Sequence, residues 1–206
     1  MIKNLLFDLG GVIMDIEKEN CVESYERLGL RNARRYFGEF SQQGPFMALE
    51  EGKITPDEFH AALRPELPDG VTDAEIDNAF CDFLTGIPVR RLAALRQLRR
   101  RYKVYLLSNT NPIMWESKIK DEFKKEGHIR EDYFDGMVTS FEAKALKPDK
   151  AIFDYTIKKL GIDPAETLFL DDSEANLKAA ARLGFNTALV AHENEFADII
   201  EKYKDA

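Results

Sequence analysis

Carboxylates that follow two apolar runs are the residues of this sequence best placed to do chemistry. Asp8 follows residues 4–7, and Asp171 and Asp172 follow residues 167–170. Such runs are typical of strands buried on both faces of a parallel sheet, where ligands bind beyond the carboxyl ends of the strands. Three carboxylates gathered there would repel one another and lose hydration. A divalent cation that prefers oxygen ligands removes this cost, so the pattern predicts a Mg²⁺ site.

A hydroxyl and a lysine are placed where they could join the same site. Ser108 and Asn109 stand at the end of an apolar run, and Lys147 precedes a helical pattern that begins with Pro148. A lysine and a hydroxyl beside a cation form a pocket for a phosphate. Phosphoryl transfer needs mainly positioning and charge neutralisation, and a carboxylate can be its nucleophile. The pattern therefore favours an enzyme that forms an aspartyl-phosphate.

Taken one at a time, these residues also fit ordinary structural roles. The acidic pair before Ser173 could cap a helix, Ser-Asn is common turn chemistry, and Lys-Pro often begins an exposed helix. Their joint placement at the strand ends of one sheet is what favours the chemical interpretation.

The elements that must position these side chains follow an alternating pattern. Strands are predicted at 4–7, 104–108, 136–140, 167–170 and 187–190, and helices at 88–102, 147–161, 173–184 and 193–204. Pro148 and Gly161 mark the start and stop of one helix, and Ser173 and Gly184 mark those of another. Strands that alternate with helices indicate an α/β fold in which a parallel five-stranded sheet is covered on both faces.

The interval from Asp15 to Gly86 interrupts this alternation and contains no convincing strand. Helices are expected instead at 17–29, 32–43, 55–67 and 72–84, two of which begin with the capping boxes Thr55–Glu58 and Thr72–Glu75. We expect the aromatic side chains of this interval to form a small core of their own, because their spacing suits helix packing. These residues are Tyr36, Phe37, Phe40, Phe46 and Phe59.

Length, charge and cysteine content restrict the class of protein. The 206 residues suit one domain with a smaller insert, and the net charge of −8 argues against nucleic acid or anionic membranes as partners. Cys21 and Cys81 cannot form a zinc site or a disulfide framework. Because we find neither a leader nor a membrane span, we expect a cytoplasmic protein; its oligomeric state is left open.

Four motifs, in order along the chain, give the sequence a recognisable likeness. They are LLFDLGGVI, VYLLSNT, Lys147 within LKPDKAIF, and LFLDDSEAN. With them the chain resembles the haloacid dehalogenase-like hydrolase superfamily over essentially its whole length. The resemblance implies a three-layer Rossmann-like catalytic core formed by residues 1–15 and 88–206. It also implies a helical cap, residues 16–87, that closes over the substrate.

The resemblance also implies a role for each site residue. Asp8 would be the nucleophile and a Mg²⁺ ligand, Lys147 would neutralise Asp8 and the phosphate, and the reaction would be hydrolysis of a small phosphorylated metabolite such as a sugar phosphate. The remaining assignments are the backbone carbonyl of Gly10 and the carboxylate of Asp172 as metal ligands, Asp171 supporting the metal directly or through water, and Ser108 with the Asn109 backbone holding phosphoryl oxygens.

Gly10 is a departure from the family pattern. Most phosphatases of the superfamily carry a second Asp there, which protonates the leaving group and then activates water. That proton transfer typically contributes a factor of about 10²–10⁴. In one interpretation the leaving group needs little protonation, as in a sugar 1-phosphate. The stretches FDLGGVIMDI and LSNTN are similar to the bacterial glucose-1-phosphatase-type branch, which also has Gly at this position.

Two other interpretations of Gly10 remain open. Another side chain could supply the proton, and the candidates are Asp15, Glu50, Glu51 and His60. Alternatively, the protein turns over poorly and mainly serves as a binding or regulatory protein. Dehalogenation of 2-halo acids is less favoured, because such enzymes typically carry Ser-Ser-Asn where this chain has Asp171, Asp172 and Ser173. Two acids there would repel a carboxylate substrate.

Overall fold

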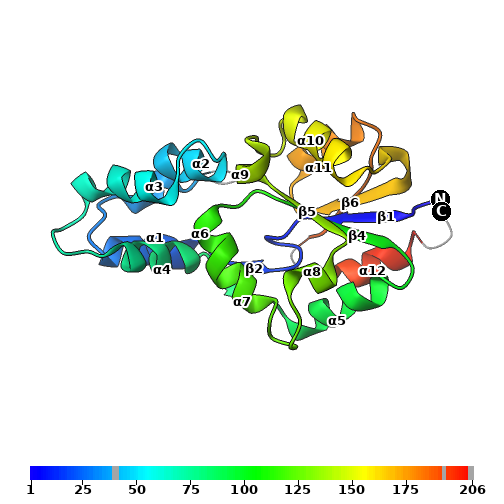
Figure 1. Ribbon diagram of the computed structural model, residues 1–206, viewed down its shortest axis with the longest axis horizontal. Helices are drawn as coiled ribbons and strands as arrows, with labels where there is room; N and C mark the ends of the chain where they lie inside the picture. Colours follow the sequence, from blue (N-terminus) through cyan, green and yellow to red (C-terminus); the bar gives the residue numbers. More distant parts are fainter. Residues whose placement is uncertain (39–41, 192–193, 204–206) are drawn as a thin grey trace.

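A five-stranded parallel sheet forms the centre of the protein, whose computed structural model describes residues 1–38, 42–191 and 194–203. Its strand order is β5-β4-β1-β6-β7, and all four neighbouring pairs are parallel (Figure 1). The predicted parallel sheet is therefore confirmed, with every strand bound within one residue of its prediction. The strands are β1 (Asn4–Phe7), β4 (Lys103–Ser108), β5 (Gly136–Thr139), β6 (Thr167–Asp171) and β7 (Asn186–Leu189).

The register of the sheet brings the polar strand ends together. Phe7 of β1 lies opposite Leu106 of β4 on one side and Leu170 of β6 on the other. The backbone N–H of Asp8 continues the ladder and donates to the carbonyl of Leu170 at 2.9 Å. Residues just beyond these three positions therefore share one edge of the sheet.

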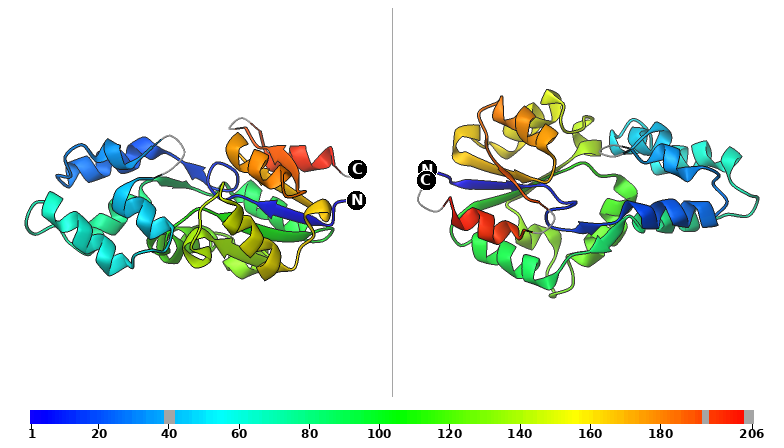
Figure 2. Two further views of the ribbon diagram at one scale, coloured as in Figure 1. Left: turned by 90° about the horizontal axis from the view of Figure 1, so that it is seen from above. Right: turned by 180° about the vertical axis from the view of Figure 1, so that it is seen from behind.

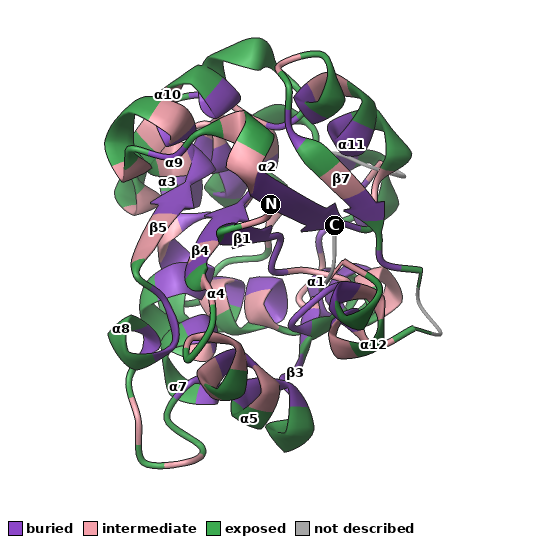
Figure 3. Cartoon of the chain, turned by 90° about the vertical axis from the view of Figure 1, so that its right-hand side faces the viewer, coloured by how far each residue is buried: buried purple, intermediate pink, exposed green. Residues whose placement is uncertain are grey.

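Helices cover both faces of the sheet and complete three layers. On one face α10 (Lys150–Leu160) and α11 (Glu174–Ala181) pack over Leu6 and Phe169; on the other, α5 (Val89–Leu98) and α12 (Phe196–Glu201) pack over Leu5 and Phe7 (Figure 1). The central strands β1 and β6 are accordingly buried at every residue, whereas the edge strand β7 is partly exposed (Figure 3). Successive side chains of a strand point to opposite faces, so an unbroken apolar run suits this double cover.

Two predicted helix starts and stops need correction. Helix α10 begins after Pro148, because Asp149 is the N-cap and accepts from the N–H of Ala151, whereas Gly161 ends the helix as predicted with φ +64°. Ser173 is the N-cap residue of α11, but its side chain makes no capping hydrogen bond. Helix α11 also ends at Ala181, three residues before Gly184.

Four of the described helices between β1 and β4 form one end of the molecule, away from the sheet (Figures 1 and 2). They are α1 (Lys18–Arg27), α2 (Gly44–Glu50), α3 (Pro56–Leu63) and α4 (Asp73–Cys81). Both capping boxes are present. The helix expected at 32–43 is wrong in its first part, which is a 3₁₀ turn (Ala33–Tyr36), and residues 39–41 lie outside the described residues. Helix α2 was not predicted.

Aromatic rings form the core of this helical end. The Phe46 ring lies with its centroid 4.9–5.1 Å from those of Tyr25, Tyr36, Phe37, Phe59 and Phe80. Aromatic pairs at such distances stabilise a core beyond the area they bury. The predicted aromatic core is therefore confirmed for Tyr36, Phe37, Phe46 and Phe59, while the prediction for Phe40 falls outside the described residues.

The chain crosses between the two ends of the molecule through a short antiparallel pair, β2 (Asp15–Ile16) and β3 (Leu84–Gly86). The expectation that this interval holds no strand is therefore wrong; strands of two and three residues are too short to show a period. Arg91 holds the pair to the core, because its guanidinium donates to the carboxylate of Asp15 at 2.7 Å and to that of Glu195 at 3.0 Å.

Short helices occupy the loops that follow β4 and β5. They are α6 (Pro112–Met114), a π-helical stretch (Trp115–Ile119), α7 (Lys120–Glu122), α8 (Arg130–Tyr133) and α9 (Ser140–Ala143), with further 3₁₀ turns at Arg64–Glu66 and Pro164–Glu166. Within the described part of the chain, no helix has the length and apolar character needed to cross a membrane.

Candidate active site

Three carboxylates converge at the carboxyl edge of the sheet. Asp8 follows β1, Asp171 ends β6 and Asp172 is next to it, and one oxygen from each lies within 4.8 Å of the others. Asp8 and Asp171 are buried, whereas Asp172 is exposed. The predicted gathering of these side chains is therefore present in the fold.

Lys147 lies between two of these carboxylates. Its Nζ is 2.8 Å from Oδ1 of Asp8 and 2.7 Å from Oδ2 of Asp171, and its side chain is 1% exposed. Burial alone would lower the pKa of the Lys147 amine, but the charges of Asp171 and Asp8 outweigh burial and raise that pKa above its ordinary value. Lys147 is therefore positively charged at neutral pH.

One ammonium does not neutralise three carboxylates. Burial raises the pKa of Asp8 to about 7 despite the attraction of Lys147, and the charges of Asp171 and Asp172 add to the rise. Partial desolvation and the charge of Asp171 likewise raise the pKa of Asp172. Excess negative charge with only oxygen donors is an environment that suits Mg²⁺, which binds one or two carboxylates and keeps several waters. The donor set therefore fits that ion.

The two adjacent aspartates, Asp171 and Asp172, differ in their hydrogen bonds. Both oxygens of Asp171 are occupied, Oδ1 by the N–H of Ser173 at 2.8 Å and Oδ2 by Lys147, and the Asn176 amide donates to both at 3.0 and 3.1 Å. Asp172 makes no comparable side-chain hydrogen bond among the described residues. Asp171 is thus fixed as a support for Lys147, and Asp172 is the one available to a ligand.

Asn176 was not found by the sequence reasoning, although its position carried a signal. It lies five residues after Asp171, in the first turn of α11, and is buried with its amide against the carboxylate. A polar residue that turns inward at the start of a helix following a strand-end acid is expected to orient that acid.

The side chain of Asn109 contacts the backbone of Lys147. Its Nδ2 donates to the carbonyl of Lys147 at 3.1 Å, and its Oδ1 accepts from the N–H of Lys147 at 2.9 Å. This reciprocal pair fixes the backbone of a residue 38 positions away. Ser108 is buried, and its hydroxyl donates to the carbonyl of Asn109 at 3.3 Å; it does not line the cavity described below.

Position 11 requires glycine because the Asp172 carboxylate lies close to its backbone. A Cβ built on Gly11 would lie 2.1 Å from Oδ2 of Asp172, and its φ of +74° is rarely adopted by other residues. Gly10 differs, because a Cβ there meets only the Ile16 side chain at 3.5 Å, an ordinary contact. Gly11 therefore lets the carboxylate of Asp172 rest against the loop that follows Asp8.

We expect Gly11→Ala to displace Asp172 and to destabilise the protein by about 1–3 kcal/mol, since it combines a clash with a strained backbone. Gly10→Ala is the matched control and is expected to have little effect on stability. Chemical denaturation measures the first effect, and calorimetric titration with Mg²⁺ measures the loss of metal affinity. Equal stability and equal Mg²⁺ affinity for the two variants would contradict this explanation of Gly11.

A cavity of about 400 Å³ opens above these groups. The sheet edge contributes Asp8, Gly10, Asn109, Lys147 and Asp172 to its wall, and the helical segment contributes Ile16, Lys18, Gln42 and Glu50. Of the four side chains considered as substitutes for an acid at Gly10, only Glu50 lines this cavity. The volume of this open pocket and its mixed polar and apolar wall suit a small, hydrophilic ligand held between the two ends of the molecule.

Comparison with known proteins gives consistent matches over nearly the whole chain. Residues 2–184 match a family model described as haloacid dehalogenase-like hydrolase. A D-ribitol-5-phosphate phosphatase from Bacteroides thetaiotaomicron is 40% identical over 187 residues, 91% of either chain. A HAD family enzyme from the same organism, crystallised with magnesium and inorganic phosphate, matches with a TM-score of 0.90 at 40% identity, over 97% of this chain and 99% of that one.

A second solved structure extends the match to another organism. A predicted HAD-like family hydrolase from Porphyromonas gingivalis is 29% identical, with a TM-score of 0.91, over 100% of this chain and 99% of that chain. The likeness in fold therefore includes the helical segment between β1 and β4 as well as the sheet.

Proposed function

We propose, because this chain belongs to the haloacid dehalogenase-like hydrolase family, that it is a Mg²⁺-dependent phosphatase that cleaves a small sugar or polyol phosphate through an aspartyl-phosphate on Asp8. The observation that carries the proposal is the group of Asp8, Asp171 and Asp172 around Lys147 beside a cavity of about 400 Å³. The relative that is named for phosphatase activity supports the same reaction.

Each site residue has a part in the proposed reaction. Oδ1 of Asp8 accepts from Lys147 and from the N–H of Leu9, which leaves Oδ2 without a protein donor among the described residues and available to attack phosphorus. Mg²⁺ would be held by Asp8, Asp172 and the carbonyl of Gly10, with Asp171 in support, and would supply positive charge beside the phosphate. Ser108 and the Asn109 backbone would bind phosphoryl oxygens.

The helical segment 16–87 is proposed as the cap over the core formed by residues 1–15 and 88–206. Its contribution to the cavity wall supports this assignment. A cap that encloses the substrate excludes water from the phosphoryl group, so that transfer to the enzyme precedes hydrolysis. Its side chains would then select the alcohol part of the substrate.

The substrate we favour is a short phosphorylated polyol or sugar. The relative's substrate, D-ribitol 5-phosphate, supports this choice, and the similarity to glucose-1-phosphatase-type enzymes stays a prediction. We further propose a cytoplasmic location and no nucleic-acid or membrane partner. The net charge of −8 and the free thiols of Cys21 and Cys81 support this.

Hydrolysis of p-nitrophenyl phosphate with Mg²⁺ and with EDTA tests the proposal. Its activated leaving group departs without a proton, so we expect release of nitrophenol with Mg²⁺ and its loss after chelation. A panel that includes D-ribitol 5-phosphate and glucose 1-phosphate then ranks substrates by kcat/KM. If purified, folded protein releases no nitrophenol with Mg²⁺, the alternative of a binding or regulatory protein is favoured instead.

A further inference from the structure

Gly10 leaves the proposed reaction without an obvious proton donor. A glycine has no side chain to protonate the departing oxygen, and only the Ile16 side chain lies within 4 Å of the space that a Cβ would take. The inference below rests on the proposed function. If the substrate is the phosphate ester of a primary alcohol, as in the relative's D-ribitol 5-phosphate, the leaving oxygen needs a proton.

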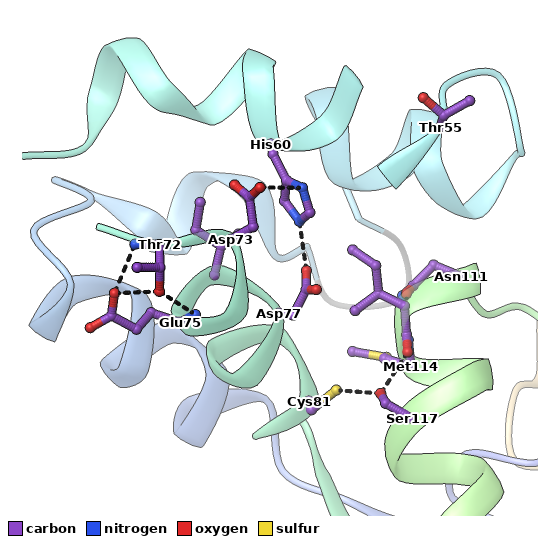
Figure 4. A network of polar contacts seen from close by, with 12 residues as sticks. Thr55, His60, Thr72, Asp73, Glu75, Asp77, Cys81, Asn111, Met114 and Ser117 are labelled. Carbon is purple, nitrogen blue, oxygen red and sulfur yellow. Dashed lines mark hydrogen bonds and ion pairs between the residues drawn. The ribbon is translucent and has the colours of Figure 1, made fainter. Parts of the chain in front are cut away.

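Three of the four candidate donors are engaged elsewhere. Asp15 is paired with Arg91 at 2.7 Å, and Glu51 with Lys53 at 2.6 Å. His60 lies on α3 with its ring toward Asp77 and Asp73 of α4, at 2.7 Å from the former (Figure 4). None of the three lines the cavity, so none can reach a substrate phosphate there.

Glu50 differs from the other three candidates in its position and in its interactions. It is the last residue of α2, is 9% exposed, and lines the same cavity as Asp8, Gly10 and Asp172. Among the described residues, no side chain or backbone group forms a hydrogen bond or an ion pair with its carboxyl group. Burial without an opposing charge raises the pKa of Glu50 to about 8. The group therefore carries a proton at neutral pH and has no protein acceptor for it.

We propose that Glu50 is a catalytic residue, which donates its proton to the ester oxygen of the substrate and replaces the acid that Gly10 lacks. Asp8 forms a bond to phosphorus as the bond from phosphorus to the ester oxygen breaks. The alcohol leaves with the proton of Glu50, whose carboxylate remains. In the second step water attacks phosphorus and gives one proton to Glu50, while the bond between phosphorus and the Asp8 oxygen breaks. The other proton of the water stays on the inorganic phosphate, Asp8 returns to a carboxylate, and Glu50 is protonated again.

The test compares Glu50→Gln with wild type on two kinds of leaving group. Gln has nearly the same shape but no acidic proton. We expect kcat for a primary alkyl phosphate, such as D-ribitol 5-phosphate, to fall by about 10²-fold more than kcat for p-nitrophenyl phosphate. Across a series of aryl and alkyl phosphates, the plot of log kcat against leaving-group pKa should become steeper in the variant.

Controls separate this role from binding and from folding. Glu51→Gln changes the neighbouring acid, which faces Lys53, and is expected to leave both rates unchanged. Gly10→Asp in the Glu50→Gln background should restore part of the alkyl phosphate rate, because a Cβ at position 10 makes only ordinary contacts with Ile16. Thermal melting checks that each variant is folded.

Two results would overturn the proposal for Glu50. One is an equal loss of kcat on both kinds of substrate. The other is a rise in KM alone, which would make Glu50 a group that only binds a substrate hydroxyl. Failure of the proposed function is a separate result, because then wild-type protein itself does not hydrolyse p-nitrophenyl phosphate with Mg²⁺.

Discussion

Asp8→Asn is expected to lower kcat by about 10⁴-fold or more, because an amide cannot form the phosphoryl intermediate. The substitution is conservative in shape, and Asn can keep the hydrogen bonds that Oδ1 accepts from Lys147 and the N–H of Leu9. Single-turnover assays with p-nitrophenyl phosphate measure the loss. Retention of a tenth of the wild-type rate would remove Asp8 from the part of nucleophile.

The same variant should be at least as stable as wild type when no divalent metal is present. The pKa of Asp8 is about 7 in the folded protein, whereas an unfolded chain holds an Asp near 3.9. Because the folded state binds the extra proton, wild type loses stability as pH rises from about 4 to about 7. The difference in the free energy of unfolding between Asp8→Asn and wild type should therefore grow in favour of the variant across this window.

Denaturation at several pH values in EDTA checks that sign. In EDTA no metal ion offsets the negative charge of the Asp8 carboxylate. Mg²⁺ supplies that positive charge, so adding it should stabilise wild type more than Asp8→Asn, whose amide is neutral. If Asp8→Asn is less stable than wild type at pH 8 without metal, the prediction is contradicted. Lys147 and the other neighbours of Asp8 would then stabilise its negative charge more than burial destabilises it.

Lys147→Met is expected to have the largest effect on stability, a loss of about 3–5 kcal/mol without metal, in addition to loss of turnover. The change keeps an unbranched chain in the space but removes the ammonium from between Asp8 and Asp171, both buried. Two carboxylates would then face each other with no cation. Chemical denaturation measures the loss.

Two further variants test whether the loss at Lys147 comes from its buried charge: Lys150→Met as a control, and Lys147→Met combined with Asp8→Asn. Lys150 is exposed and pairs with Asp154 on the surface of α10, so Lys150→Met should change stability by only about 0–1 kcal/mol. In Lys147→Met combined with Asp8→Asn, one of the uncompensated charges is gone, and the double variant should be more stable than the sum of the two single-variant effects predicts. Strictly additive effects would contradict a direct charge interaction between the two residues.

The sheet edge could be predicted from sequence because its signals are local. Each strand is an unbroken apolar run that ends in a polar residue, and the carboxyl ends of parallel strands meet at one edge of the sheet. That β1 and β6 are neighbours there depends on pairing across 163 positions and was not predicted. The capping boxes at Thr55 and Thr72 are equally local, since each is completed three residues later. Such features survive in the fold because no distant contact is needed to form them.

The parts that were missed depend on contacts between distant residues. Asn109 holds the backbone of Lys147 across 38 positions, and Asn176 reaches Asp171 only because the first turn of α11 faces inward. Helix α2 begins with Gly44 and Pro45, a pair that favours a turn, and is covered by aromatic rings from α1, α3 and α4. Glu50 could be distinguished from Glu51 only once the helix had a known face toward the cavity.

The short β2–β3 pair has a consequence for how this protein can diversify. The chain enters the helical segment after Asp15 and leaves it at Gly86, and these two residues are partners in one ladder. Apart from Glu50, the segment between them can lengthen, shorten or change its sequence while the ends stay at a fixed separation. Descendants of one ancestor could then exchange preferences for different alcohols through this insertion alone, while the phosphate chemistry at the strand ends is inherited unaltered.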